Sequence, residues 1–141
     1  MEDKVSEYTL DHQVGYLLRL ANQRHSSLFQ EIVPYGLTPT QFAALVKLAE
    51  LKKCSQNELG RRTAMDVATI KGVVERLRKK GLVEVNSDPN DKRRAILSIP
   101  EDQLGIVPEL YEAGNKVSNL TLSPLSASER KTLIRMLKRL G

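Results

Sequence analysis

Residues 55–99, SQNELGRRTAMDVATIKGVVERLRKKGLVEVNSDPNDKRRAILSI, contain the change of pattern that decides the fold. Up to Lys80 the apolar residues recur with the period of a helix, and after Gly81 they alternate with polar residues as in a strand. The stretch therefore predicts a short helix from Ser55 to about Thr63, a second helix from Asp66 to Lys80, and two strands after it.

Both predicted helices have clear start signals. Ser55-Gln56-Asn57-Glu58 has the form of a capping box, and Asp66 can cap the second helix. The second helix has one apolar face, which consists of Ile70, Val73, Val74 and Leu77. A short helix, a tight turn and a second helix with a basic outer face form the helix-turn-helix pattern.

The strands are predicted at residues 82–86 and 95–99, with a turn-rich loop at 87–94 between them. Lys92, Arg93 and Arg94 give this loop a basic tip. The hairpin follows the second helix directly, so it is expected to form a wing. The predicted fold is mainly α, a winged helix-turn-helix with one β-hairpin.

Helices are expected on both sides of this unit. Spacings of three, four and seven predict an amphipathic helix over residues 11–33, whose apolar positions are Leu10, Val14, Leu17, Ala21, Leu28 and Ile32. Thr38, Pro39 and Gln41 predict a capped helix that runs to about Leu51.

After the hairpin, Pro100 is expected to stop the strand and begin the next helix. Ser126 and Glu129 form a third capping box before a final helix, which is expected to bury Leu133, Ile134, Leu137 and Leu140. The outer helices carry more apolar residues than one small chain can cover, which favours a homodimer. The predicted divisions are dimerisation helices at 1–36 and 101–141, and a DNA-binding lobe at 37–100.

Positive charge is concentrated in about a quarter of the chain. The net charge is +5, and residues 61–94 contain ten Lys and Arg against five acidic residues. The rest of the chain has twelve of each and is neutral. A focused positive field attracts a polyanion, although a solvated charged face is the usual alternative.

The outer face of the helix over 66–80 has the features of a DNA-reading helix. Ala68, Thr69 and Gly72 are small enough to admit the backbone to a major groove, and Lys71 and Arg76 supply hydrogen-bond donors. An ordinary surface helix is the alternative.

The wing tip can insert an arginine into a minor groove. Asp91 is expected to orient that guanidinium through a bidentate pair. Asp88 and Asp91 also fit simple turn positions.

Two motifs resemble one known family. Asp88-Pro89-Asn90-Asp91-Lys92-Arg93 resembles the wing of the MarR family of transcriptional regulators, and residues 36–42, GLTPTQF, are similar to that family's G-L-T-x-x-Q-F entry into its second helix. The order of elements agrees from about residue 10 to residue 140. One departure is Pro100, where the family usually has Thr.

The resemblance implies an obligate homodimer with recognition helices in successive major grooves of a pseudo-palindrome and wings in the flanking minor grooves. It implies that Arg93 is the minor-groove residue and that Asp91 supports it. The predicted function is a repressor that a small aromatic or phenolic carboxylate releases from its operator. The predicted DNA contacts are Ser55, Arg61, Ala68, Thr69, Lys71, Gly72, Arg76, Lys79, Asp91, Lys92, Arg93 and Arg94.

The effector is expected to contact the first helix. His12, Arg19 and His25 are the candidates, because a His beside an Arg can receive a carboxylate. A hydrogen-bonded core residue is the alternative for His25. Residues 17–24, LLRLANQR, are similar to regulators of aromatic-acid degradation.

Other classes of function have less support. Cys54 is the only cysteine, which fits a reducing cytoplasm and a small buried residue, with a redox-responsive regulator as the alternative. The sequence shows no membrane span, signal peptide, phosphate loop or metal-spaced cluster, so no enzyme, metal or cofactor is predicted. A winged helix used only for protein contacts remains the rival to DNA binding.

Overall fold

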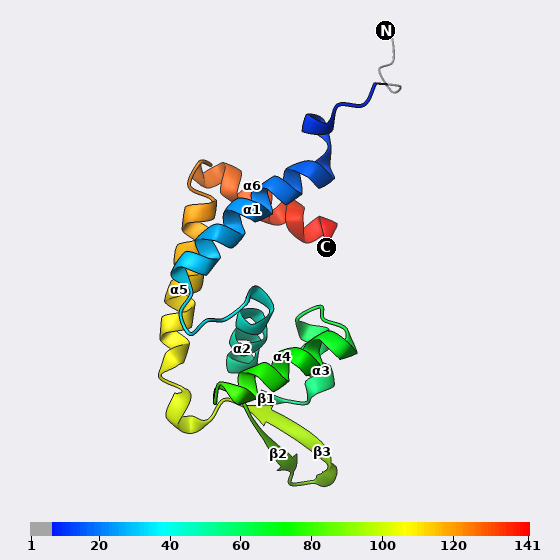
Figure 1. The fold of residues 1–141 in the computed structure, drawn as a ribbon, viewed down its shortest axis with the longest axis vertical. Coiled ribbons are helices and arrows are strands. Elements are labelled where there is room, and N and C mark those ends of the chain that lie inside the picture. The colour runs from blue at the N-terminus through cyan, green and yellow to red at the C-terminus, as the bar shows by residue number, and fades with distance from the viewer. Residues whose placement is uncertain (1–6) are drawn as a thin grey trace. The chain divides into compact units, whose positions relative to one another are not determined.

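The computed structural model describes residues 7–141, which form two compact units. One unit joins the chain up to Ile32 with Lys116–Gly141, and the other comprises Val33–Asn115. The elements in chain order are η1 (Leu10–His12), α1 (Val14–Ile32), α2 (Pro39–Leu51), β1 (Lys53–Cys54), α3 (Gln56–Arg62), α4 (Val67–Lys79), β2 (Glu84–Asp88), β3 (Asp91–Ser98), η2 (Glu101–Gln103), α5 (Ile106–Thr121) and α6 (Ala127–Leu140) (Figure 1).

The unit over Val33–Asn115 contains the main hydrophobic core. Its largest fully buried side chains come from four helices and one strand: Leu45, Leu48, Leu59, Ile70, Leu77, Leu97 and Leu110. Full burial of each such side chain stabilises the fold by about 1.5–3 kcal/mol. The core thus joins α2, α3, α4 and α5 to the small sheet.

Two of the predicted helix starts are confirmed in this unit. Thr38 and Gln41 form a reciprocal capping box before α2, with Pro39 in the first turn. Asp66 caps α4, because its Oδ1 accepts a hydrogen bond of 2.8 Å from the Thr69 amide. Hydrogen bonding by that amide also lowers the pKa of the Asp66 carboxyl.

The predicted capping box of α3 is only half formed. Ser55 Oγ accepts a hydrogen bond of 3.2 Å from the Glu58 amide, as expected. The Glu58 carboxylate does not return to Ser55. It lies 3.6 Å from Arg62 Nη2, one helical turn along α3. Arg62 competes for the Glu58 carboxylate, which explains why the predicted hydrogen bond from the Ser55 amide to Glu58 does not form.

The sheet is antiparallel, has the order β1-β3-β2, and has more strand than predicted. Lys53 and Cys54 form β1, which the sequence analysis did not predict and which pairs with Ser98 and Leu97 of β3. The basic residues expected in a loop at 87–94 lie mostly within β3, and only Pro89 and Asn90 separate it from β2. Strand pairing therefore continues almost to the tip of the hairpin.

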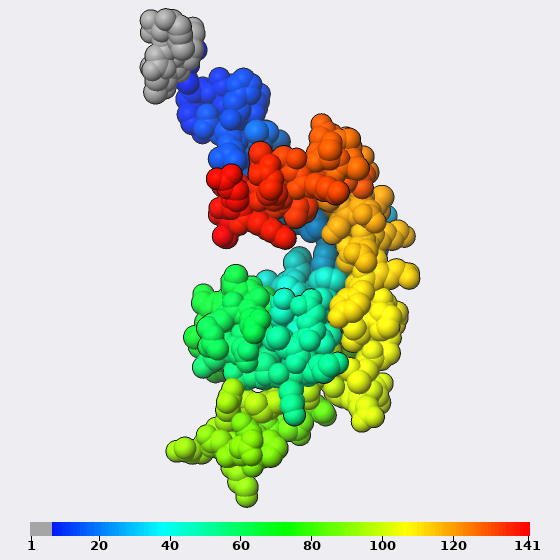
Figure 2. Space-filling view, turned by 180° about the vertical axis from the view of Figure 1, so that it is seen from behind, coloured from blue at the N-terminus to red at the C-terminus, as the bar shows by residue number. Residues whose placement is uncertain are grey.

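The α3–turn–α4 segment followed by the β2–β3 hairpin is the predicted winged helix-turn-helix. Its recognition-helix positions Ile70, Val73, Val74 and Leu77 are all buried, as expected. Gly81 ends the helical stretch with a φ of +75°, a conformation that glycine adopts without steric cost. Figure 2 shows the hairpin projecting from the rest of this unit.

Two helix boundaries differ from the predictions. The helix predicted from residue 11 is interrupted, because residues 10–12 form the 3-10 turn η1 and α1 begins at Val14. Pro100 does not begin a long helix. It precedes the 3-10 turn η2, and α5 starts only at Ile106.

The unit that contains α1 and α6 buries little apolar surface. Arg24 closes the end of α5 by donating hydrogen bonds to the carbonyl oxygens of Leu120 and Thr121. The Ser126–Glu129 capping box of α6 is confirmed. Burial of the apolar residues of α6 was predicted wrongly for the single chain, since Leu133 is only half-buried and Ile134, Leu137 and Leu140 are exposed.

Within residues 7–141, every helix is too short or too polar to span a lipid bilayer.

Candidate nucleic-acid interface

The outer face of α4 is open to solvent along its length. Ala68, Thr69, Lys71 and Arg76 are exposed, opposite the four buried residues of the same helix. A Cβ atom built on Gly72 would meet no other atom within 4 Å. Packing within this chain therefore does not require glycine at position 72, and the small residue leaves room for an external partner to approach the backbone.

Close packing fixes α4 against α3. A Cβ on Gly60 would lie 3.1 Å from both Ile70 Cγ2 and the Met65 carbonyl oxygen. The connecting turn includes Ala64 with a φ of +56°, which a residue with a Cβ seldom adopts. This turn and the close contact determine the angle at which α4 presents its outer face.

Arg93 lies in β3 near the tip of the hairpin with 93% of its side chain exposed. Asp91 Oδ1 accepts a hydrogen bond of 3.1 Å from the Arg93 amide and lies 3.4 Å from Arg93 Nε. The predicted bidentate pair is thus wrong for this structure, since one carboxylate oxygen serves both the backbone and the guanidinium. The terminal nitrogens of Arg93 project freely.

Asp88 has the turn role that the sequence allowed. Its Oδ1 accepts a hydrogen bond of 2.9 Å from the Asn90 amide, which closes the tip of the hairpin. Because side chains alternate along a strand, Lys92 and Arg94 project to the face opposite Arg93. Arg94 lines a depression of about 500 Å³ together with residues of β1, α3 and β2.

The remaining predicted DNA contacts have different surroundings. Ser55 uses its hydroxyl oxygen to cap α3, while Arg61 and Lys79 are exposed near the carboxyl ends of α3 and α4. The sequence analysis did not select Lys53, which is exposed on β1 next to the wing strand β3. The missed strand explains this omission, because nothing else in the sequence pattern places residue 53 beside residue 98.

The comparisons with known proteins agree with this geometry. The pattern of the MarR family matches residues 35–94. The transcriptional repressor NicR of Pseudomonas putida is 37% identical over 134 residues, which cover 94% of this chain and 85% of NicR.

The protein belongs to the MarR family.

Two solved structures extend the similarity. A probable transcriptional regulator from Pseudomonas aeruginosa has a TM-score of 0.90 and 48% identity, covering 94% of this chain and 100% of its own. BpsR of Bordetella bronchiseptica, whose DNA binding is regulated by 6-hydroxynicotinic acid, has a TM-score of 0.87 and 34% identity, covering 95% of this chain and 96% of its own. As a member of the MarR family, the protein is a transcriptional regulator with a winged helix.

The three residues selected for an effector have different surroundings. His25 is half-buried, and its Nδ1 lies 2.9 Å from Thr121 Oγ1. Arg19 lies over the ring of Tyr16, with 5.4 Å from its Cζ to the ring centroid. His12 is exposed in η1. The structure therefore gives His25 a polar partner within the chain, as the alternative reading of that residue allowed.

Cys54 is buried, with 5% of its surface exposed. Burial raises the pKa of its thiol, and the nearby Glu58 carboxylate adds to this effect more than Arg62 opposes it. The thiol is therefore protonated at neutral pH, although it lies directly before the start of α3. In residues 7–141 no group of three His, Cys, Asp or Glu side chains is arranged to hold a metal ion.

Proposed function

We propose that this MarR-family protein is a repressor that binds a pseudo-palindromic operator as a homodimer. In each subunit the exposed face of α4 enters a major groove, and Arg93 at the hairpin tip enters the adjacent minor groove. The observation that carries the proposal is the pairing of an open, glycine-containing α4 face with a projecting arginine on the same compact unit. The 37% identity to the repressor NicR supports the direction of regulation.

The proposed DNA contacts come from both α4 and the β2–β3 hairpin. Lys71 and Arg76 supply donors from α4, and Lys79 supplies a cation near its carboxyl end. Ala68, Thr69 and Gly72 allow a close approach, and Asp91 restrains Arg93. The proposal retains Ser55, Arg61, Lys92 and Arg94 as contacts to phosphates, which position a protein without reading sequence.

Exposed apolar side chains support the homodimer. In α1, Val14, Leu17 and Leu18 have 65%, 48% and 47% of their surface exposed. In α6, Met136 and Leu140 have 49% and 72% exposed. Several large apolar side chains exposed on one unit are typical of a protein–protein interface. We assign residues 1–36 and 101–141 to dimerisation and 37–100 to DNA binding.

We also propose that a small aromatic carboxylate releases the protein from its operator. The support is the control of BpsR by 6-hydroxynicotinic acid, together with 34% identity over almost the whole chain. Arg19 and the His25–Thr121 pair are the proposed carboxylate and ring contacts in this chain, with His12 as a third candidate.

The central experiment measures binding to the DNA upstream of the protein's own gene. Fluorescence anisotropy should show tight, salt-dependent binding to one footprinted segment and weaker binding to a shuffled duplex of equal length. Equal affinity for the two duplexes would overturn the proposal and favour a winged helix used for protein contacts.

A thermal-shift screen tests the effector. Hydroxylated benzoic and nicotinic acids are added to the purified protein, and a ligand at 100 times its Kd should stabilise the folded state by about 2.7 kcal/mol. The same compound should reduce operator binding. The corresponding hydroxylated benzamides and nicotinamides are matched controls, because they keep the ring hydroxyl and lack the carboxylate. A shift produced equally by the amides would contradict carboxylate recognition.

A further inference from the structure

The helix α6 carries an excess of positive charge outside the winged-helix unit. Its sequence, ASERKTLIRMLKRL, contains five basic residues and one acidic residue. That acid, Glu129, closes the capping box, because its Oε1 accepts a hydrogen bond of 2.8 Å from the Ser126 amide. The carboxylate that is nearest in sequence is therefore used by the helix itself.

The basic residues lie around a shallow depression of about 640 Å³, whose lining is Arg130, Lys131, Ile134, Arg135, Lys138 and Arg139. Across residues 7–141, no carboxylate forms an ion pair with any of these cations. Only Arg130 has a side-chain hydrogen bond, which its Nε donates to the Leu125 carbonyl oxygen at 3.0 Å. The other four, Lys131, Arg135, Lys138 and Arg139, are exposed and make up what is called here the α6 basic face.

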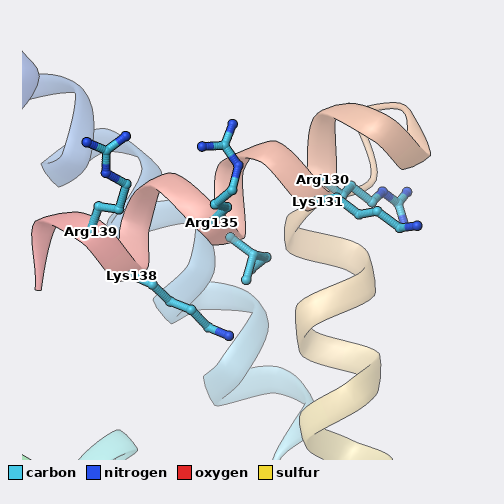
Figure 3. Close-up of a pocket in the computed structure, with 6 residues that line it drawn as sticks. Arg130, Lys131, Arg135, Lys138 and Arg139 are labelled. Atoms are coloured by element: carbon cyan, nitrogen blue, oxygen red, sulfur yellow. The ribbon is translucent and has the colours of Figure 1, made fainter.

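The cations spread along the helix and do not converge on one point. Figure 3 shows Arg135 and Arg139 extending in the same direction one turn apart, while Lys138 extends to another side and Lys131 lies nearer the start of the helix. From Lys131 to Arg139 the helix rises about 12 Å. A single small anion cannot contact side chains arranged in this way, whereas an extended polyanion can.

We propose that the α6 basic face binds the phosphate backbone of a nucleic-acid duplex, at a site separate from the winged helix. Duplex DNA carries one negative charge per about 1.7 Å of its axis, so cations spread over about 12 Å of helix match the spacing of several phosphates. Binding of this kind needs no base contacts and tolerates any sequence. The protein then holds a second segment of DNA in addition to its operator.

The apolar residues of α6 distinguish this partner from a lipid surface. An amphipathic helix binds a membrane by burying its apolar face. Three apolar residues of α6, Met136, Leu137 and Leu140, lie outside the lining of the depression, and the homodimer proposed above would cover them. A duplex needs only the basic face, and the proposal requires that the homodimer contact uses the apolar residues and leaves this face exposed.

The test uses the full-length chain in a K71A/R93A background, which weakens the winged helix. Binding of a fluorescent random-sequence duplex is measured between 50 and 200 mM salt. With three phosphates neutralised, the α6 basic face should contribute about −2.7 to the slope of log K against log salt, which corresponds to about 40-fold in affinity over that range. Adding R135E/R139E should remove at least 90% of the remaining affinity.

The matched control is K52E/K116E, which changes the net charge by the same amount at two exposed lysines outside α6. It should reduce duplex binding less than twofold. Circular dichroism and sedimentation verify that both variants remain folded and keep the parent's oligomeric state. An equal loss in both variants would overturn the proposal, since net charge alone would then account for binding.

Two further probes separate the partner classes. Vesicles of phosphatidylcholine and phosphatidylserine, and poly-glutamate, are titrated into the same variants. If R135E/R139E reduces binding to either probe and leaves duplex binding unchanged, the proposal is wrong. The repressor proposal is tested separately, by operator binding of Arg93 variants in the wild-type background. A negative result for α6 therefore leaves the repressor proposal standing.

Discussion

The Tyr35 hydroxyl donates a hydrogen bond of 2.6 Å to Glu109 Oε1 and thereby joins the turn before α2 to α5. The backbone at Tyr35 has a φ of +67°, and the following Gly36 has +61°. Lys80, the C-cap residue that follows α4, donates a hydrogen bond of 3.1 Å from Nζ to the Tyr35 carbonyl oxygen. One residue in an unusual backbone conformation thus contacts both α5 and the end of the recognition helix.

The hydrogen bond to Glu109 should be visible in an alkaline titration. It is the largest cause of the raised pKa of Tyr35, and it favours the protonated phenol. Stability from this bond is therefore fully present below the unfolded pKa of about 10 and is lost as the pH rises through the higher folded value. Tyrosinate absorbance should show a late-titrating component that is absent in Y35F.

The variants E109Q and E109A separate the causes of that shift. Gln keeps a hydrogen-bond acceptor without the charge, so E109Q should retain more of the raised pKa than E109A. If the late-titrating tyrosine persisted unchanged in E109A, the hydrogen bond would not be responsible for it.

Arg93→Ala should weaken operator binding by about 1–3 kcal/mol, as expected for a specific contact. The free terminal nitrogens of Arg93 explain the expectation, because Asp91 restrains only Nε and the amide. The measurement is an anisotropy titration at fixed salt. Arg93→Lys is the matched control, and it should recover less than half of the loss because an ammonium cannot reproduce the planar guanidinium. Equal binding by R93A and wild type would remove the wing from the interface.

The recognition unit was largely predictable because its signals are local. Thr38, Asp66 and Gly81 each specify a helix end through hydrogen bonds or backbone preference within a few residues, and all three are confirmed. The buried face of α4 was equally clear from its period. Side chains that contact only their own helix and its immediate neighbours leave a readable pattern in the sequence.

The predictions that were wrong or missing concern residues whose partners are distant in sequence or lie outside the chain. Strand β1 exists only because Lys53 and Cys54 meet Ser98 and Leu97, more than forty residues away. The apolar residues of α6 were expected to be buried, but nothing in residues 7–141 covers Leu140, which is 72% exposed. The His25–Thr121 contact likewise joins two helices that no local pattern connects.

Lys79→Ala should weaken binding to all duplexes evenly. Lys79 is exposed in the last turn of α4, where a phosphate contact is expected and a base contact is not. The slope of log K against log salt should become shallower by about 1, while the ratio of operator to shuffled-duplex affinity stays constant. A change in that ratio would indicate that Lys79 reads bases.

Glycines 60 and 72 should respond in opposite ways to alanine. At Gly72 the new methyl group meets nothing within 4 Å, so G72A should stabilise the helix by about 0.5–1 kcal/mol. At Gly60 it would lie 3.1 Å from Ile70 Cγ2, so G60A should destabilise the fold by about 1–3 kcal/mol. Urea unfolding measures both values.

A larger side chain at position 72 tests the interface and leaves the core unaffected. G72L should melt within a few degrees of wild type because its site is open, yet lose at least tenfold in operator affinity because the helix can no longer approach the groove closely. Wild-type affinity in a folded G72L protein would show that this face of α4 does not meet DNA.

The thiol of Cys54 should react slowly with disulfide reagents because it is buried. Only the thiolate is nucleophilic, and burial both raises the pKa of Cys54 and blocks access to it. An aromatic disulfide reagent should label the native protein far more slowly than the protein in urea, with a rate limited by opening of the fold. C54A should remain responsive to the effector in the operator assay, because a buried thiol with a raised pKa is poorly suited to sensing. Rapid labelling of the native protein, together with loss of the response in C54A, would instead establish a redox-responsive regulator.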